Sequence, residues 1–174
     1  MDENQKKQTS TMETFLSFKL GKEVFAASAN NVVNILELKP ITKVPHAPEY
    51  MSGVINLRGQ VLPVIDMRIK FGMSPIEPTV DTCIIVLNIN IEKEEVKLGI
   101  LVDAVSEVLE LEDNQIEPSP TIGTKYKAEF IRGMFKKDES FIMLLNLDLI
   151  FTKDELVLVE ETTTKANVAT EEEK

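Results

Sequence analysis

Short apolar segments alternate with turn signals along most of the chain. Segments rich in β-branched and aromatic residues are interrupted at short intervals by Gly, Pro, Asn or charged residues, a pattern that predicts strands. The first hairpin is predicted over residues 14–26. Leu16, Phe18 and Leu20 alternate on one strand face there, and Gly21 and Lys22 supply a two-residue turn.

The rest of the chain predicts more strands and only short helices. Further strands are expected over residues 41–44, 54–57, 61–65, 82–91, 96–102, 105–111, 130–135 and 141–147. Residues 28–38 favour a short helix, because Val32, Ile35 and Leu36 recur at helical spacing and Ser28 can cap them. A second short helix is expected at about 148–157. No long amphipathic helix alternates with the strands, so we predict two small antiparallel barrels packed side by side.

The composition along the chain divides it into one folded region and two tails. Residues 1–13 are almost wholly polar and residues 160–174 are acidic, so both are expected to be disordered. The folded domain is expected over 14–159. Gly and Pro cluster at residues 72–78, which places the first barrel at about 14–76 and the second at about 77–150, with interweaving of elements left open.

Charge and hydropathy exclude several partners. The net charge of −10 over 174 residues would repel a phosphate backbone, which argues against nucleic acid. The longest apolar runs, at 83–87 and 141–145, are too short to span a bilayer, so no membrane insertion is expected. The N-terminal residues lack the apolar stretch of a signal peptide, and we therefore expect a cytoplasmic protein.

Candidate catalytic chemistry is sparse. The single histidine, His46, lies in a proline-bounded loop, and the single cysteine, Cys83, lies in an apolar run where a thiol acts as a small hydrophobe. No metal-ligand cluster or glycine-rich nucleotide loop is present in the sequence, so no cofactor and no metal are expected. Asp66 and Asp103 each end an apolar run and could form the acid pair of a small hydrolase, but backbone hydrogen bonding at strand ends is the favoured interpretation.

A second alternative is a barrel that binds single-stranded nucleic acid through aromatic platforms. The absence of Trp, the two Tyr residues and the acidic charge argue against it.

Residues 53–72 carry the most specific motif in the chain. They read GVINLRGQVLPVIDMRIKFG, and this segment closely resembles the signature of the CheW family of chemotaxis coupling proteins. Two further segments agree in order: residues 99–109 resemble a strand of the family's second barrel, and residues 130–133 with 141–147 resemble its closing hairpin. The resemblance covers about residues 14–156. Because only tails flank this region, we expect a stand-alone coupling protein rather than a domain of the kinase CheA or of CheV.

The resemblance implies a fold and a function. The fold would be a pair of intertwined five-stranded barrels of the SH3 type. The function would be that of a non-enzymatic adaptor that joins transmembrane chemoreceptors to the histidine kinase CheA. The cytoplasmic hairpin tip of the receptor would lie in a groove between the barrels, and the adaptor would dock on the CheW-like regulatory domain of CheA. Such a protein would be monomeric alone and would form rings in membrane-associated receptor arrays.

Two arginines lie within the signature. Arg58 precedes Gly59 in a predicted tight turn, where its guanidinium can point outward, and by resemblance we assign it to receptor binding. The alternative is an internal ion pair with Asp66 or Glu37. For Arg68, a contact with a partner protein and a structural ion pair are equally favoured interpretations.

Apolar candidates for the groove follow from the same resemblance. Val32, Ile35 and Leu36 could line an apolar trough for a receptor helix, and ordinary core packing is an equal alternative for each of them. Val105 and Val108 are further receptor candidates near the groove. Three glycines are expected to meet the backbone requirements of turns: Gly53, Gly59 and Gly133.

Overall fold

The described chain consists mainly of strands. The structure, a computed structural model, describes residues 11–118 and 128–172, with the backbone alone at residues 128 and 165–172. Its strands are β1 Glu13–Leu20, β2 Glu23–Ser28, β3 Val32–Glu37, β4 Met51–Leu57, β5 Gln60–Asp66, β6 Cys83–Ile91, β7 Glu94–Val102, β8 Ala104–Leu111, β9 Ile131–Lys137 and β10 Ser140–Leu145. Its α-helices are α1 Met67–Lys70, α2 Leu147–Ile150 and α3 Lys153–Glu172, and short 3₁₀ turns span Ala29–Asn31, Asp113–Gln115 and Ala128–Phe130.

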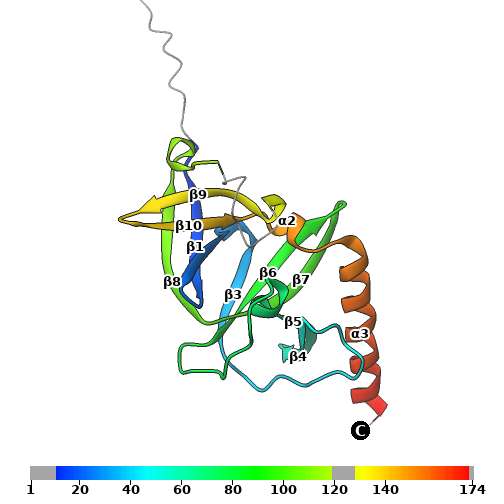
Figure 1. The fold of residues 1–174 in the computed structure, drawn as a ribbon. Helices are drawn as coiled ribbons and strands as arrows, with labels where there is room; N and C mark the ends of the chain where they lie inside the picture. Colours follow the sequence, from blue (N-terminus) through cyan, green and yellow to red (C-terminus); the bar gives the residue numbers. More distant parts are fainter. Residues whose placement is uncertain (1–10, 119–127, 173–174) are drawn as a thin grey trace, which may run out of the picture.

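The strands form two five-stranded sheets with the same pattern of antiparallel and parallel pairing (Figure 1). The orders are β8-β1-β2-β10-β9 in the first barrel and β3-β6-β7-β5-β4 in the second barrel. Each sheet curls on itself, and an isolated bridge joins its ends: Glu117 to Met134 in the first barrel and Thr42 to Val54 in the second. The expected pair of five-stranded barrels is confirmed. Their pairing is not wholly antiparallel, because β2 pairs with β10 and β5 pairs with β7 in parallel.

The two barrels are interwoven along the chain, and the predicted division at residue 76 is wrong. The chain begins in the first barrel with β1 and β2, builds the whole second barrel with β3–β7, and returns to complete the first with β8–β10. Residues 72–78 lie in the connection between β5 and β6, which are both strands of the second barrel. Turn residues mark where the chain reverses, but they do not determine which sheet the next strand joins.

The helix predicted over residues 28–38 is also wrong. Only Ala29–Asn31 form a helical turn, capped by Ser28, whose Oγ accepts a hydrogen bond from the Asn30 amide at 3.4 Å. The following residues form β3, which pairs antiparallel with β6. Sheet pairing satisfies the backbone of this β-branched segment, and that outweighs its helical spacing.

The C-terminal helix is longer than expected. α3 extends to Glu172, through most of the segment predicted to be a disordered tail, and the predicted helix over 148–157 is divided between α2 and α3. Leu156, Val159 and Thr162 of α3 are buried, and the helix contacts β4 and β5 (Figure 1). A helical face that buries these side chains is stable despite its polar neighbours. The expected N-terminal tail lies outside the described residues up to position 10, and β1 already begins at Glu13.

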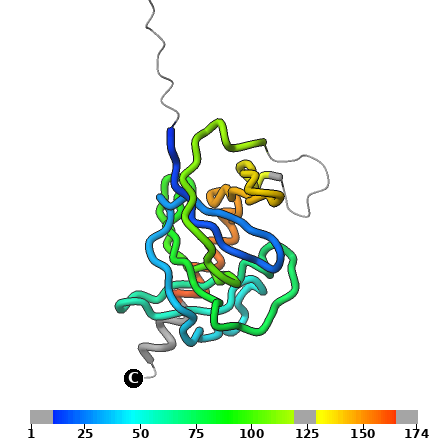
Figure 2. Tube along the Cα trace, turned by 90° about the vertical axis from the view of Figure 1, so that its left-hand side faces the viewer, coloured from blue at the N-terminus to red at the C-terminus, as the bar shows by residue number. Residues whose placement is uncertain are grey.

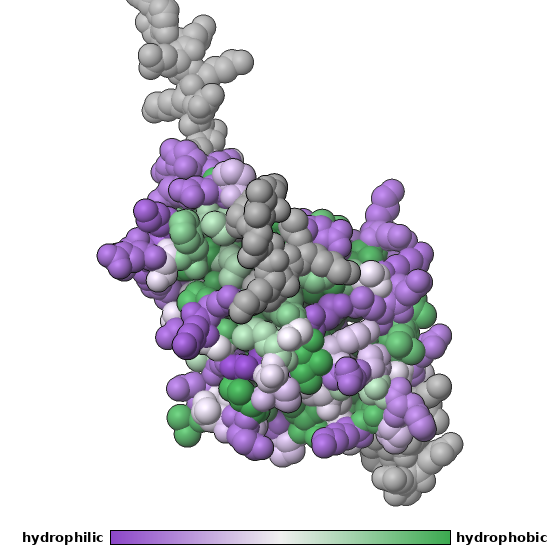
Figure 3. All heavy atoms as spheres, in the orientation of Figure 1, coloured by the Kyte–Doolittle hydropathy of each residue, from purple (hydrophilic) through white to green (hydrophobic). Residues whose placement is uncertain are grey.

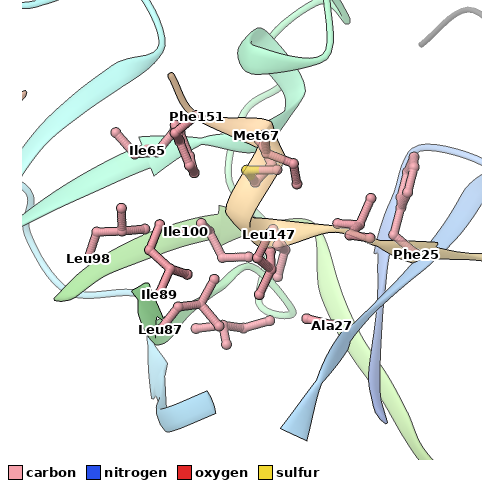
Figure 4. Packing of buried hydrophobic residues seen from close by; sticks show 14 of the residues in the cluster. Phe25, Ala27, Ile65, Met67, Leu87, Ile89, Leu98, Ile100, Leu147 and Phe151 are labelled. Atoms are coloured by element: carbon pink, nitrogen blue, oxygen red, sulfur yellow. The ribbon is translucent and has the colours of Figure 1, made fainter. Parts of the chain in front are cut away.

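Three apolar clusters hold the molecule together. One cluster fills the first barrel around Phe15 and Leu144, and another fills the second barrel around Val64 and Ile84. The largest cluster joins side chains of both sheets and the helices; Figure 4 shows part of it, with Phe25 of the first barrel near one end and Leu98 and Ile100 of the second at the other. This shared core places the two barrels side by side.

Candidate partner-binding groove

An open groove lies where the edges of the two barrels meet. Its walls come from residues 35–37 of β3, residues 80–83 before and at the start of β6, and residues 104–105 of β8, and they border an open depression of about 300 Å³. β3 and β6 belong to the second barrel and β8 belongs to the first. The structure thus brings together Ile35, Leu36 and Val105, three of the residues that the sequence proposed for receptor binding.

An irregularity in β3 decides which apolar side chains reach the groove. Val32 pairs with Leu87 and Ile35 pairs with Ile85. Val32 and Ile35 are three positions apart in β3, whereas their partners are only two positions apart in β6. This bulge places Val32 and Ile35 on the same face of the strand, where plain alternation would put them on opposite faces. Val32 packs against the shared core, whereas Ile35 is 45% exposed in the groove. Leu36 faces the other way and packs against the cluster inside the second barrel.

A second bulge has the same effect in β8. The register with β1 shifts between Leu16, opposite Val108, and Phe18, opposite Val105, so that Ser17 faces two residues of β8. The buried Ser17 hydroxyl donates to the Glu107 carbonyl and accepts from the Glu107 amide, both at 2.9 Å. Val105 and Val108 consequently share a face of β8. Val105 lines the groove, and Val108 lies outside it with 64% of its surface exposed.

Arg58 lies outside this groove. It occupies the β4–β5 turn in a left-handed conformation with φ 52°, and the Gly59 amide donates to the Asn56 side chain at 3.0 Å. Arg58 is exposed and forms no hydrogen bond or ion pair with the residues that the structure describes, so the alternative of an internal pair with Asp66 or Glu37 is not realised. It lines a separate depression at one end of the second barrel, together with Val33, Asn34, Leu57, Gln60 and Lys97.

Arg68 forms the structural pair that the sequence left open. Its Nε donates to Asp103 Oδ1 at 2.8 Å and its Nη2 donates to Asp103 Oδ2 at 2.7 Å, while Nη1 donates to the Ser74 carbonyl at 2.9 Å. Burial raises the pKa of Asp103, but the hydrogen bonds from Arg68 and the Gly21 amide outweigh it and hold that pKa below its ordinary value. Asp103 is therefore an ionised structural partner.

The other carboxylate of the hypothetical acid pair also has a structural role. Asp66 caps α1, because its Oδ1 accepts from the amides of Arg68 at 2.9 Å and Ile69 at 3.4 Å. Burial raises the pKa of Asp66, more than these hydrogen bonds lower it. Both acids thus accept backbone hydrogen bonds, as expected of strand ends, and Asp103 also pairs with Arg68. Within residues 11–118 and 128–172, no cluster of three His, Cys, Asp or Glu side chains could hold a metal ion.

The two residues considered as lone catalytic candidates occupy different environments. His46 is exposed in a turn with φ 61°. Cys83 is 9% exposed at the start of β6, and burial raises the pKa of its thiol. The interpretation of Cys83 as a buried hydrophobe is confirmed.

Two of the three glycines predicted for turns lie in strands. Gly53 is in β4 and Gly133 is in β9, each directly before the residue that bridges the ends of its barrel. A Cβ on Gly53 would lie 2.2 Å from the Thr42 carbonyl oxygen, and one on Gly133 would lie 2.9 Å from the Glu117 oxygen. These glycines permit the close backbone approach that closes each barrel, and only Gly59 serves a turn.

Sequence reasoning missed the loop wall of the groove. Val80 is fully exposed beside it, and Thr82 is buried and accepts a hydrogen bond from the Thr79 amide at 2.8 Å. The only sequence signal was an isolated valine in a polar loop after Pro78. In the orientation of Figure 3, hydrophobic side chains are exposed in the middle of the face and hydrophilic side chains dominate its rim.

Comparison with known proteins gives a consistent result. The model of the CheW-like domain matches residues 14–155. The chain belongs to the CheW-like domain family. The chain is 40% identical over 140 residues to a protein named chemotaxis protein CheW from Rhizobium meliloti, covering 80% of this chain and 88% of the relative. A probable chemotaxis protein CheW from Rhizobium etli is 39% identical with the same coverage.

A solved structure of the family has the same fold. The crystal structure of the scaffolding protein TtCheW from Thermoanaerobacter tengcongensis superposes with a TM-score of 0.73 at 32% identity, over 86% of this chain and 94% of that one. The resemblance seen in residues 53–72 thus extends to the arrangement of the whole CheW-like domain. In the part of the chain that the structure describes, no helix has the length and apolar character needed to cross a membrane.

Proposed function

We propose that this chain is a non-catalytic adaptor of bacterial chemotaxis that couples transmembrane chemoreceptors to the histidine kinase CheA. The single observation that carries the proposal is the groove between the barrels of a CheW-like domain, with the apolar side chains of Ile35 and Val105 on its walls. A scaffold acts through binding surfaces, and the two aspartates considered for catalysis are engaged in structural contacts. The adaptor binds both partners and places them next to each other.

The groove has the character needed for the tip of a receptor's helical hairpin. A helix docks through apolar side chains at successive turns into an apolar trough with polar residues at its edge. Ile35 and Val105 supply apolar surface from opposite barrels, and Glu37 and Asp81 supply carboxylates beside it. Val80, fully exposed, extends the apolar surface at the loop wall. Of the remaining candidates, Val32 supports β3 from the core, and Leu36 supports it from inside the second barrel.

Arg58 contributes a separate polar contact. The turn presents its guanidinium to solvent without an internal partner among the described residues, which leaves it available for a carboxylate or a helix end of the receptor. Because Arg58 lies outside the groove, its contact is with the flank of the receptor bundle or with a neighbouring protein in the array. Val108, exposed on β8 and also outside the groove, supplies apolar surface on the first barrel for such a contact.

The kinase docks elsewhere on the adaptor. Receptor and kinase must be bound at the same time for coupling, so the CheW-like regulatory domain of CheA has to use a surface other than the groove. The adaptor is monomeric alone, binds no nucleic acid and inserts no segment into the membrane. It reaches receptor arrays through its partners.

Binding measurements with matched variants test this proposal. Ile35→Glu and Val105→Glu place a charge in the groove, and we expect each to weaken binding of a receptor signalling fragment at least about tenfold, a change of about 1.4 kcal/mol. Binding of the CheA regulatory domain should be unchanged. Leu158→Glu is the control, since Leu158 on α3 is 46% exposed, as Ile35 is 45% exposed, but lies outside the groove. Equal receptor affinity of the wild type and both groove variants would contradict the assignment.

A further inference from the structure

Asp103 occupies the only position between β7 and β8, where the chain crosses from the second barrel to the first. Its backbone amide donates to the Lys19 carbonyl of β1 at 3.0 Å. Its carboxylate accepts a hydrogen bond from the Gly21 amide, in the β1–β2 turn, at 2.6 Å. Through these contacts Asp103 is attached to the first barrel.

The same carboxylate is attached to the second barrel. Arg68 lies in α1, directly after β5, and binds both oxygens of Asp103 through Nε and Nη2. The two side chains are only 13% and 19% exposed, so solvent competes little for their charges. A bidentate arginine–carboxylate pair fixes direction as well as distance, because the guanidinium is planar.

A second carboxylate, that of Asp66 at the end of β5, acts on the pair. The hydrogen bond to Asp103 raises the pKa of Arg68, against the effect of burial, and the nearby Asp66 carboxylate raises it further. Arg68 is thus held as a cation between two carboxylates. Asp66 accepts hydrogen bonds from the α1 amides, and Asp103 is the carboxylate to which the guanidinium donates two hydrogen bonds.

Arg68 also fixes the loop that leads to the groove. Its Nη1 donates to the Ser74 carbonyl, and Met73 next to it lies so near the β1–β2 turn that a Cβ on Gly21 would be 3.1 Å from its Cε. The same loop continues to residues 80–83, which form one wall of the groove. In Figure 2 the tip of the blue β1–β2 hairpin lies beside this green loop.

We infer that Gly21, Arg68 and Asp103 form an inter-barrel clasp that sets the relative orientation of the two barrels and thereby the width of the groove. Arg68 and Asp103 are positioning residues: they touch no partner and act by holding the groove walls, Ile35 on one barrel and Val105 on the other, at the separation that the partner requires. The functional part of this inference rests on the proposed receptor binding, whereas the effect on barrel orientation does not.

Distances between spin labels on the isolated protein test the clasp directly. Labels at Glu139 in the first barrel and Glu95 in the second, both exposed, are introduced as cysteines in a Cys83→Ala background. We expect Arg68→Met to broaden the distance distribution or shift its maximum. The matched control is Arg132→Met, because Arg132 forms an equivalent bidentate pair with Glu13, at 2.8 and 2.6 Å, within the first barrel alone.

Receptor binding supplies the second readout. Arg68→Met is expected to weaken binding of the receptor fragment about tenfold, with Arg132→Met close to the wild type. Asp103→Asn serves as an independent variant if Arg68→Met does not fold, because its amide oxygen still accepts from Gly21 while the ion pair is lost. A variant that carries both Arg68→Met and Asp103→Asn should bind the receptor fragment no more weakly than the weaker-binding of the two single variants.

The outcomes separate the clasp from the proposed function. A label distribution in Arg68→Met and Asp103→Asn that matches Arg132→Met overturns the clasp, whatever the receptor does. A changed distribution with unaltered receptor affinity overturns the positioning role. If the wild type itself binds no receptor fragment, the proposed function fails, while the distance measurement still decides whether the clasp orients the barrels.

Discussion

Replacing Ser17 with alanine tests whether the bulge in β8 is held by one side chain. Ser17 is fully buried, and its hydroxyl makes two hydrogen bonds to the backbone of Glu107 at the point where β8 carries its extra residue. The substitution removes one oxygen atom and leaves the carbon skeleton unchanged. Any effect therefore reports the loss of these hydrogen bonds rather than the loss of apolar packing.

The expected loss of stability follows from the two hydrogen bonds. Each is worth about 1 kcal/mol, and a buried backbone group left without a partner costs about 1–3 kcal/mol, so the variant should lose about 2–4 kcal/mol of unfolding free energy. For a domain of this size that corresponds to a decrease in Tm of about 4–16 °C. Because the bulge sets the facing of Val105 and Val108, receptor binding should weaken as well.

Thermal and urea unfolding of the two serine variants measure this effect. Ser106→Ala is the matched control, since Ser106 lies in β8 at the same bulge but is exposed. We expect the control to stay within about 0.5 kcal/mol of the wild type. A Ser17→Ala variant as stable as Ser106→Ala would show that the bulge persists without the Ser17 hydroxyl.

Three further substitutions probe barrel closure, helix docking and acid stability. Gly53→Ala should cost about 3 kcal/mol in urea unfolding, since its Cβ would meet a backbone oxygen at 2.2 Å, whereas Gly59→Ala, with open space around it, should cost about 1 kcal/mol; equal costs would contradict the closure argument. Lys70→Met removes the ion pair with Glu155 of α3 and the ammonium that lies 4.9 Å from the centre of the Tyr50 ring, so hydrogen exchange of the α3 backbone amides should accelerate. Unchanged exchange would show that apolar contacts alone dock the helix. The hydrogen bond from Arg132, opposed by burial, lowers the pKa of Glu13, so the stabilising contribution of this carboxylate is present above the unfolded pKa of about 4.5 and is lost as the pH falls through the lower folded pKa. The difference in unfolding free energy between wild type and Glu13→Gln should therefore shrink from about pH 6 to about pH 3. A difference that stays constant over this range would contradict the role of the Arg132 hydrogen bond.

Local patterns in the sequence predicted the strands well but not their partners. The hairpin over residues 14–26 was readable from alternation and a glycine turn, and it forms β1 and β2 as expected. The parallel pairing of β2 with β10 joins residues more than a hundred positions apart, and no local signal encodes it. The interweaving of the barrels was therefore beyond a residue-by-residue reading, and only the family resemblance indicated intertwined barrels.

The candidate site shows why helical spacing misled. Val32 and Ile35 are three residues apart, which suggests a helix face, but a bulge gives a strand the same grouping. A bulge has no sequence signature of its own at this position, because it depends on the register with β6. Likewise, Arg68 and Asp103 are 35 positions apart, and their pairing follows from the tertiary position of α1 beside the crossover.

Reconstituted kinase activation tests whether this chain couples receptors to CheA. CheA autophosphorylation is measured with receptor signalling fragments assembled as clusters, with and without this protein. We expect a large increase on its addition, reduced by Ile35→Glu and by Arg58→Glu but retained by Leu158→Glu. No increase with the folded wild-type protein, in an assay whose partners respond to a known coupling protein, would contradict the assignment of this chain as a coupler of receptors and kinase.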